Sequence, residues 1–208
     1  MAKDIAKFWD EKFSSKEYIY GKEPNKYVKK VLDKLKPGCI LFPAEGEGRN
    51  AVYAATKGWD VYAFDPSISG KNKAMELAKT KNLSIDYQIN DVEKVNYKEE
   101  SFDAIVLVFA HFHKNVRRAY HQKLSKYLKK GGHIILEAFS QAHIKNQQTN
   151  PKAGGPKNID LLYNLEELKE DFNNFEFIVL EETSTKLEEG EHHVGKSNVL
   201  RILAKKIN

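Results

Sequence analysis

The sequence is poor in cysteine and in long apolar runs. Its single cysteine, Cys39, cannot form an intramolecular disulfide, so a disulfide-stabilised secreted scaffold is excluded and a reducing, cytoplasmic location is expected. No apolar run approaches the roughly 18 residues that span a bilayer, and the first residues lack a signal-peptide core. No repeat, low-complexity tract or linker divides the chain. We therefore expect one domain over residues 1–208, without a membrane partner.

The chain has enough apolar residues for a core, and its charge is only slightly positive. Hydrophobic residues make up 41 % of the 208 residues, and 34 Lys and Arg exceed 29 Asp and Glu, for a net charge of +5. The segment 114–130 is basic, and the segment 160–191 is acidic. In 114–130 the apolar residues keep helical spacing, so the basic ones lie mainly on a solvent face. The net charge is therefore weak support for a nucleic-acid partner.

Apolar segments alternate with helical patterns along most of the chain. Two helices are expected within 3–36, and further helices at 49–57, 67–81, 114–130 and 165–172. Strands are expected at 39–42, 59–64, 84–89, 102–109, 133–139, 175–182 and 197–205. This rhythm predicts an α/β fold, a parallel sheet covered by helices on both faces. The last two strands lack a crossover helix and should form an antiparallel hairpin.

The loop after the first expected strand contains residues 46–51 (GEGRNA), which match the G-x-G-x-x-G/A pattern. Glycine lets the backbone approach a ligand closely. Asp65, at the end of the next strand, can accept hydrogen bonds from both ribose hydroxyls. A strand, this loop and the spaced acid together indicate a ligand that contains adenosine, whereas a tight turn with packing glycines is the purely structural alternative.

Two acids in this loop favour one adenosine ligand over another. Glu45 and Glu47 would repel the pyrophosphate of a dinucleotide, but they suit the sulfonium and ammonium cations of S-adenosylmethionine. Asp91 follows the third strand, where an adenine amino group would lie. The terminal hairpin supports the same ligand.

The sequence resembles the class I S-adenosylmethionine-dependent methyltransferases. Within them, it resembles the tellurite-resistance/thiopurine-type enzymes that act on small molecules. The resemblance covers nearly the whole chain. It rests on residues 9–13 (WDEKF), 20–25 (YGKEPN), 45–50 (EGEGRN), 61–65 (VYAFD), 102–106 (FDAIV), 131–137 (GGHIILE), 154–156 (GGP), 165–168 (LEEL) and 189–195 (EGEHHVG).

The resemblance implies a Rossmann-like three-layer α/β/α sandwich. Its mostly parallel seven-stranded sheet would have an antiparallel C-terminal strand, with a helical lid over residues 1–36 and the core over 38–208. S-adenosylmethionine would be the cofactor. The implied cofactor-binding residues are Trp9, Tyr20, Ala44, Glu45, Gly46, Asp65, Pro66, Asp91, Val92, Phe109 and Ala110.

The glycine loop departs from the usual acid-x-Gly-x-Gly-x-Gly pattern of these enzymes. Phe42 stands where the acid is expected, and Ala44 replaces the first glycine. We expect Glu45 to replace the missing acid as the contact for the amino group of the cofactor.

Histidines are the candidate catalytic groups, because histidine titrates near neutrality. His111 follows the fourth strand and either lines the pocket or is a buried, hydrogen-bonded side chain. His192 and His193 either contact substrate or form an exposed hairpin tip. Arg49 either binds an anionic acceptor or anchors its helix. His111 and His113 lack a third ligand partner, so no metal is expected.

Several functions remain open at this stage. We expect methyl transfer to a small-molecule acceptor, such as a thiol, tellurite or selenite. A soft nucleophile needs little help from a base, and aromatic faces at Phe109, Trp9 or Tyr20 would stabilise the methyl-sulfonium. The alternatives are an RNA or other nucleic-acid methyltransferase, a noncatalytic binder of S-adenosylmethionine and an NAD(P)-dependent oxidoreductase.

Residues 141–158 form either a lid over the acceptor or a surface insertion. The acceptor atom and the oligomeric state do not follow from the sequence.

Overall fold

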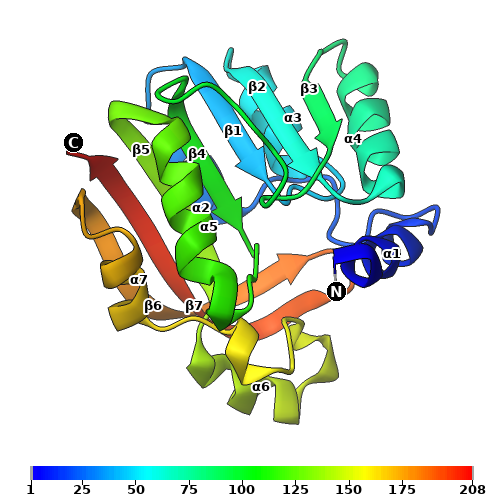
Figure 1. Cartoon of the computed structure of the whole chain (residues 1–208). Coiled ribbons are helices and arrows are strands. Elements are labelled where there is room, and N and C mark those ends of the chain that lie inside the picture. Colours follow the sequence, from blue (N-terminus) through cyan, green and yellow to red (C-terminus); the bar gives the residue numbers. More distant parts are fainter. Residues whose placement is uncertain (1, 208) are drawn as a thin grey trace.

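A computed structural model describes residues 2–207, with side chains from residue 5 onward, so both termini of the expected 1–208 span lie outside it. Its centre is one seven-stranded sheet in the order β3-β2-β1-β4-β5-β7-β6 (Figure 1). The strands are β1 (Cys39–Pro43), β2 (Asp60–Asp65), β3 (Asp86–Ile89), β4 (Phe102–Val108), β5 (Leu128–Phe139), β6 (Phe175–Glu189) and β7 (His193–Lys206). Strands β1 to β5 pair in parallel, and β7 lies antiparallel between β5 and β6. This confirms the expected fold class.

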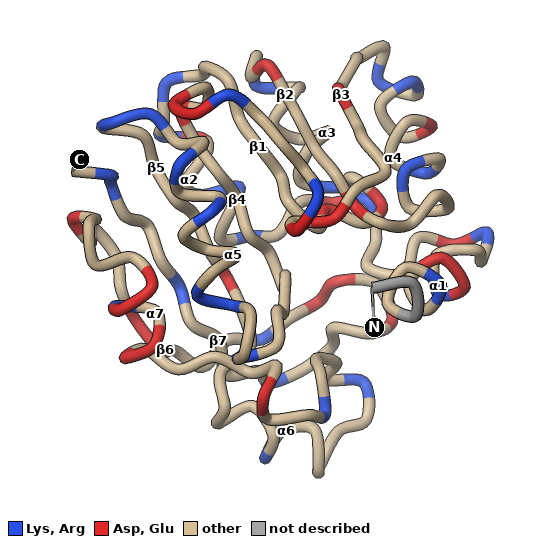
Figure 2. The backbone as a smooth tube through the Cα atoms, viewed as in Figure 1, with Lys and Arg blue, Asp and Glu red and all other residues tan. Residues whose placement is uncertain are grey.

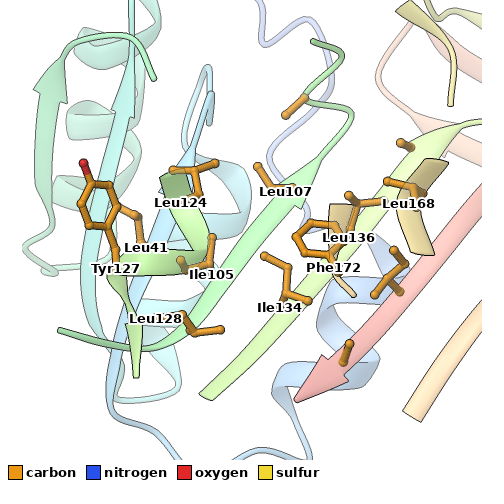
Figure 3. Close-up of a cluster of buried hydrophobic side chains, with 14 of the residues drawn as sticks. Leu41, Ile105, Leu107, Leu124, Tyr127, Leu128, Ile134, Leu136, Leu168 and Phe172 are labelled. Carbon is orange, nitrogen blue, oxygen red and sulfur yellow. The ribbon is translucent and has the colours of Figure 1, made fainter. Parts of the chain in front are cut away.

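Helices cover both faces of the sheet. They are α1 (Ala2–Phe13), α2 (Lys26–Leu32), α3 (Arg49–Thr56), α4 (Ile68–Thr80), α5 (Lys114–Tyr127), α6 (Ile144–Thr149) and α7 (Leu165–Asp171). One core cluster joins α2, α3 and α4 to the sheet. The other joins α5 and α7 to the opposite face through side chains such as Leu124, Leu136 and Phe172 (Figure 3). The two apolar layers account for the continuously hydrophobic strands.

The expected boundary between the fifth helix and the fifth strand is wrong. Helix α5 ends at Tyr127 rather than near residue 130, and β5 begins at once at Leu128. Gly131 and Gly132 do not end the helix but lie inside β5, where the pairing with β4 shifts register. A Cβ on Gly132 would lie 2.9 Å from Leu128 Cδ1, so the glycine allows β5 to pack closely there.

The terminal hairpin is longer than the sequence indicates. Strand β6 runs to Glu189 instead of residue 182, and β7 begins at His193 instead of residue 197. The added residues alternate between exposed and buried, so they lack the continuous apolar character used to locate the strands. Residues 141–158 are also not irregular throughout. They contain α6 and the short 3₁₀ helices η1 (Gln141–His143) and η2 (Pro151–Ala153), and η3 (Ile159–Leu161) follows them.

Candidate active site

The glycine loop joins β1 to α3 by a backbone path that ordinary residues seldom adopt. Ala44, Gly46 and Gly48 have φ angles of 52°, 62° and 84°. Ala44 therefore adopts a conformation that is uncommon for a residue with a side chain. At Gly48 a Cβ would also lie 2.4 Å from the Cβ of Ala74 in α4. The conformation of the loop therefore requires glycine at position 48 as well as at position 46.

The two loop glutamates have different structural roles. Glu45 Oε1 accepts hydrogen bonds from the amides of Asn50 (2.9 Å) and Ala51 (2.8 Å) in the first turn of α3. Burial nevertheless raises the pKa of Glu45 to about 7. The contact of Glu45 with the amino group of the cofactor remains a prediction. In the structure, its carboxyl group caps the N-terminus of α3, the positive end of the helix dipole.

Glu47 points toward the N-terminal segment. Its carboxylate accepts a hydrogen bond from the Ile19 amide (2.9 Å) and forms an ion pair with Lys73 (2.7 Å). Lys73 also donates to the carbonyl of Glu17. The charge of Glu47 is therefore already neutralised by a lysine, which weakens the argument that both loop acids serve a cationic ligand.

Asp65 lies at the end of β2, beside the glycine loop. Its Oδ2 accepts from the Gly46 amide (3.1 Å) and its Oδ1 from the Ser67 amide (2.9 Å). The side chain is only 5 % exposed, and burial raises its pKa to about 6. Each oxygen keeps a further acceptor position, so the carboxylate fits two ribose hydroxyls. The half-buried Pro66 follows it directly.

The next strand brings the predicted adenine contacts to the same edge. Asp65 pairs with Ile89 in the register of β2 and β3, so the residues after β3 lie beside Asp65. Asp91 accepts hydrogen bonds from the amide and the ammonium of Lys94, and Val92 is buried in the core. The topology thus brings Gly46, Asp65 and Asp91 together, as the sequence indicates.

Helix α1 lies across this edge of the sheet, between α4 and the tip of the β6–β7 hairpin (Figure 1). Asp10 accepts hydrogen bonds from the Ser67 hydroxyl (2.9 Å) and the Ser69 amide (2.7 Å) at the start of α4. The buried ring of Phe13 packs where a Cβ on Gly46 would point, 3.0 Å away. The Phe13 ring therefore covers the glycine loop at Gly46, next to Asp65.

Aromatic side chains of the N-terminal segment surround a lysine. The Trp9 ring stacks on Phe13, and Lys12 Nζ lies 5.0 Å from the Trp9 ring centre and 5.2 Å from that of Tyr20. Lys12 also donates a hydrogen bond to the Tyr20 hydroxyl (2.9 Å). Burial lowers the pKa of Lys12. The two rings thus hold the Lys12 ammonium, and the expected contact of Trp9 and Tyr20 with the methyl-sulfonium stays a prediction.

The end of β4 adds another aromatic side chain. Phe109 has a φ of 51°, which is strained for a bulky residue. Its ring stacks on Phe139 at 4.5 Å and meets the His193 ring edge-on at 4.6 Å. The His193 ring also packs against the Tyr20 ring, with 4.4 Å between the two ring centres. Ala110 follows and is buried. Residues from the N-terminal segment, β4, β5 and β7 thus meet in one cluster.

His111 is a buried histidine with both ring nitrogens in hydrogen bonds. Its Nδ1 lies 2.8 Å from the Leu161 carbonyl, so it is the donor, and Nε2 accepts from the Phe139 amide at 3.3 Å. Burial lowers its pKa to about 3. This is the hydrogen-bonded alternative, and in this arrangement His111 has no free lone pair with which to act as a base.

Arg49 and His193 share a buried carboxylate, that of Glu189. Arg49 donates to Glu189 Oε2 at 2.8 Å, and His193 Nδ1 lies 3.3 Å from the same oxygen. Arg49, Glu189 and His193 are all less than a tenth exposed. Arg49 therefore takes the helix-anchoring role. His193 is not part of an exposed tip, whereas its neighbour His192 is exposed.

Further buried polar groups continue this network. Asn25 donates to Glu189 Oε1 (2.9 Å) and to Glu137 Oε1 (2.6 Å), and Arg201 pairs with Glu137 Oε2 (2.6 Å). Sequence reasoning assigned no role to Asn25, Glu137 or Glu189. A signal was available for all three: Asn25, Glu137 and Glu189 lie in the motifs that carry the resemblance, but Asn25 is more than a hundred residues away from both glutamates.

The chain is similar to known proteins over a defined domain and over its whole fold. A family model described as a methyltransferase domain matches residues 40–132. No curated protein matches the chain. Solved structures do match.

A protein studied for the conversion of a disulfide bond into a thioacetal group during echinomycin biosynthesis is 17 % identical, with a TM-score of 0.78 and coverage of 97 % of this chain and 92 % of that one. TehB from Haemophilus influenzae is 20 % identical, with a TM-score of 0.70 and coverage of 97 % and 66 %. Magnesium protoporphyrin IX methyltransferase from Synechocystis PCC 6803, solved with bound S-adenosylhomocysteine, is 15 % identical, with a TM-score of 0.71 and coverage of 97 % and 98 %.

The family model identifies a methyltransferase domain at residues 40–132, which is less than half of the chain. At these identities the structural likeness shows the fold, that of S-adenosylmethionine-dependent methyltransferases. Together these findings support a methyltransferase with S-adenosylmethionine as its cofactor.

Proposed function

We propose that this enzyme methylates a small molecule with a soft nucleophilic atom, a thiol or an oxyanion of the tellurite or selenite type. The observation that carries the proposal is the compact cluster of Tyr20, Phe109, Phe139 and His193 at the end of β4. Phe139 and His193 are buried, and Tyr20 and Phe109 are half-buried, between the N-terminal segment and the β6–β7 hairpin, and this suits a small acceptor. The sulfur chemistry named for the echinomycin protein also supports a sulfur acceptor.

Cofactor binding is proposed at the edge formed by the glycine loop and β2. Asp65 would accept the ribose hydroxyls, Gly46 would allow the methionine part to approach, and Asp91, Val92 and Pro66 would frame the adenine. Trp9 and Tyr20, with the helical segment 1–36, would close over the bound cofactor as a lid. The bound cofactor supplies a methyl group on a good leaving group, so the protein mainly orients the acceptor and excludes water.

A nucleic-acid acceptor is less well supported. The basic residues of α5 lie beside the acids of α7 and the preceding segment (Figure 2). Lys114 pairs with Asp160, and Arg118 pairs with Glu170. These pairs reduce the positive potential that would attract a phosphate backbone.

Membrane association finds no support either: within residues 2–207, no helix has the length and apolar character of a transmembrane segment. A cytoplasmic location remains our proposal, based on the single cysteine.

Two measurements test the proposed function. Calorimetry with S-adenosylmethionine, S-adenosylhomocysteine and NAD should give binding of the first two only. Methyl transfer should then be assayed with an alkyl thiol, tellurite, selenite and small amines, and we expect turnover with thiols or the oxyanions. No turnover with any small acceptor, together with RNA binding that falls steeply with salt, would favour the nucleic-acid alternative.

A further inference from the structure

The aromatic cluster contains one side chain that is equipped to accept a proton. His111 has both nitrogens occupied, and His192 lies outside the cluster. The Tyr20 hydroxyl accepts from Lys12, and burial raises the pKa of Tyr20 well above its usual value. His193 remains. Its ring touches Tyr20 and Phe109, so it lies where the sequence argument expects the acceptor and the sulfonium to meet.

The partner of His193 determines which nitrogen carries the proton. A carboxylate can only accept hydrogen bonds, so Glu189 Oε2 requires the hydrogen to be on His193 Nδ1. Nε2 of the neutral ring then has a lone pair, and no hydrogen bond reaches Nε2 from any residue between 2 and 207. Burial lowers the pKa of His193 to about 4, although Glu189 opposes this effect, so the ring is neutral at pH 7.

Two further residues hold this arrangement. Burial disfavours an ionised Glu189, but hydrogen bonds from His193 and Arg49 lower its pKa to about 2 and keep it a carboxylate. Asn25 donates to its other oxygen. Glu189 and Arg49 are therefore positioning residues: they fix the tautomer of His193 and do not themselves reach the acceptor.

We propose that His193 Nε2 takes the proton of a thiol that enters the site in its neutral form, while Glu189 and Arg49 hold the ring in place. This rests on the proposed function and narrows its acceptor to a protonated thiol. The thiol sulfur forms a bond to the methyl carbon, and the carbon–sulfonium bond breaks with its electron pair left on the departing sulfur. The S–H proton moves to Nε2, and the imidazolium later releases it to water.

A weakly basic histidine is sufficient for this step. A free thiol has a pKa of about 8.5, but its proton becomes strongly acidic as the sulfur lone pair forms the new bond. The proton is therefore transferred during or after attack, when even a base of lowered pKa is a good acceptor. This explains how a buried neutral histidine can serve a thiol, and why it would matter little for an acceptor that is already ionised.

The test compares two acceptors in wild type, His193→Gln, Glu189→Gln and the exposed control His192→Gln. An alkyl thiol is mostly protonated at pH 7, whereas thionitrobenzoate is an aromatic thiolate. We expect His193→Gln to lower kcat with the alkyl thiol by about 100-fold or more, and with thionitrobenzoate by no more than about threefold. Glu189→Gln should show the same acceptor-dependent loss, and His192→Gln none. Calorimetry should give an unchanged Kd for S-adenosylmethionine in all four proteins.

A second readout does not depend on turnover. Nitrogen NMR of the wild-type protein at pH 7 should give a neutral His193 with its hydrogen on Nδ1, and Glu189→Gln should change that tautomer. A protonated Nε2 in the wild type, or equal losses with both acceptors in His193→Gln, would overturn the role of His193. A wild-type enzyme that binds S-adenosylmethionine but methylates neither thiol would overturn the proposed thiol acceptor itself, whatever the tautomer.

Discussion

Removing the charge of Glu47 should loosen the N-terminal segment from the rest of the enzyme. The Glu47 side chain is 3 % exposed and that of Lys73 is 11 %, so their ion pair at 2.7 Å is buried. Glu47 also holds the Ile19 amide. In Glu47→Gln the amide oxygen can still accept from Ile19, but the Lys73 ammonium loses its counter-charge while it stays buried.

The magnitude follows from this uncompensated charge. Removing one partner of a buried pair costs about 3–5 kcal/mol, and the retained bond from Lys73 to the Glu17 carbonyl favours the lower end, about 3 kcal/mol. For a chain of this size that free energy corresponds to a fall in Tm of about 6–12 °C. Replacing both partners, in Glu47→Gln with Lys73→Met, removes the unpaired charge and should restore about half of the loss or more.

The assay is urea unfolding followed by circular dichroism. Glu188→Gln is the matched control, because Glu188 also pairs with lysines but is exposed, and it should not change stability measurably. A loss in Glu47→Gln no larger than in this control would refute the reasoning. A double variant that is less stable than Glu47→Gln would refute it as well.

Three further outcomes are expected. Asp65→Ala should weaken binding of S-adenosylmethionine by about 10-fold or more in calorimetry, because hydrogen bonds to a charged group contribute about 1.5–3 kcal/mol, and an unchanged Kd would put the ribose elsewhere. His111 has a pKa lowered to about 3, so its neutral form stabilises the fold above pH 6.5, and this stability is lost as the pH falls from 6.5 toward 3. Urea unfolding at pH 7 and pH 5 should give a smaller acid-dependent loss in His111→Gln than in wild type; equal slopes would contradict this. Gly48→Ala should lower the free energy of unfolding by about 2 kcal/mol or more, since it adds a clash with Ala74 to backbone strain, whereas Gly58→Ala, with the same φ of 84° but open space, should cost only the strain of about 1–2 kcal/mol. Equal losses in the two glycine variants would show that the close contact has no energetic effect.

The parts of the fold that sequence predicts best are those set by local periodicity. The strand ends that carry Gly46, Asp65 and Asp91 follow from apolar runs and turns, and parallel pairing then brings these residues together. The roles of the polar side chains are different. Glu47 and Lys73 are 26 residues apart, and Asn25 and Glu189 are 164 apart, so no local pattern reveals that they are paired.

The predicted boundary between α5 and β5 was wrong for a related reason. A pair of glycines usually ends a helix, but here Gly132 is needed because Leu128 and the Asp103 carbonyl approach it closely. That requirement comes from the packing of β5 against β4. The local sequence around Gly132 carries no sign of this packing. The same holds for His193, whose burial depends on Tyr20 and Phe109 rather than on the polar residues next to it.

The position of the β6–β7 hairpin at the end of the chain has a consequence for the order in which the sites are synthesised. Its tip contacts the N-terminal segment, where Gly190 packs on Ile19 and Tyr20, and β7 lies between β5 and β6 in the sheet. During synthesis, the glycine loop and Asp65 leave the ribosome long before His193. A nascent chain therefore contains the proposed cofactor edge before it contains the proposed acceptor side. Under this proposal, transfer to an acceptor requires β7, which is synthesised last.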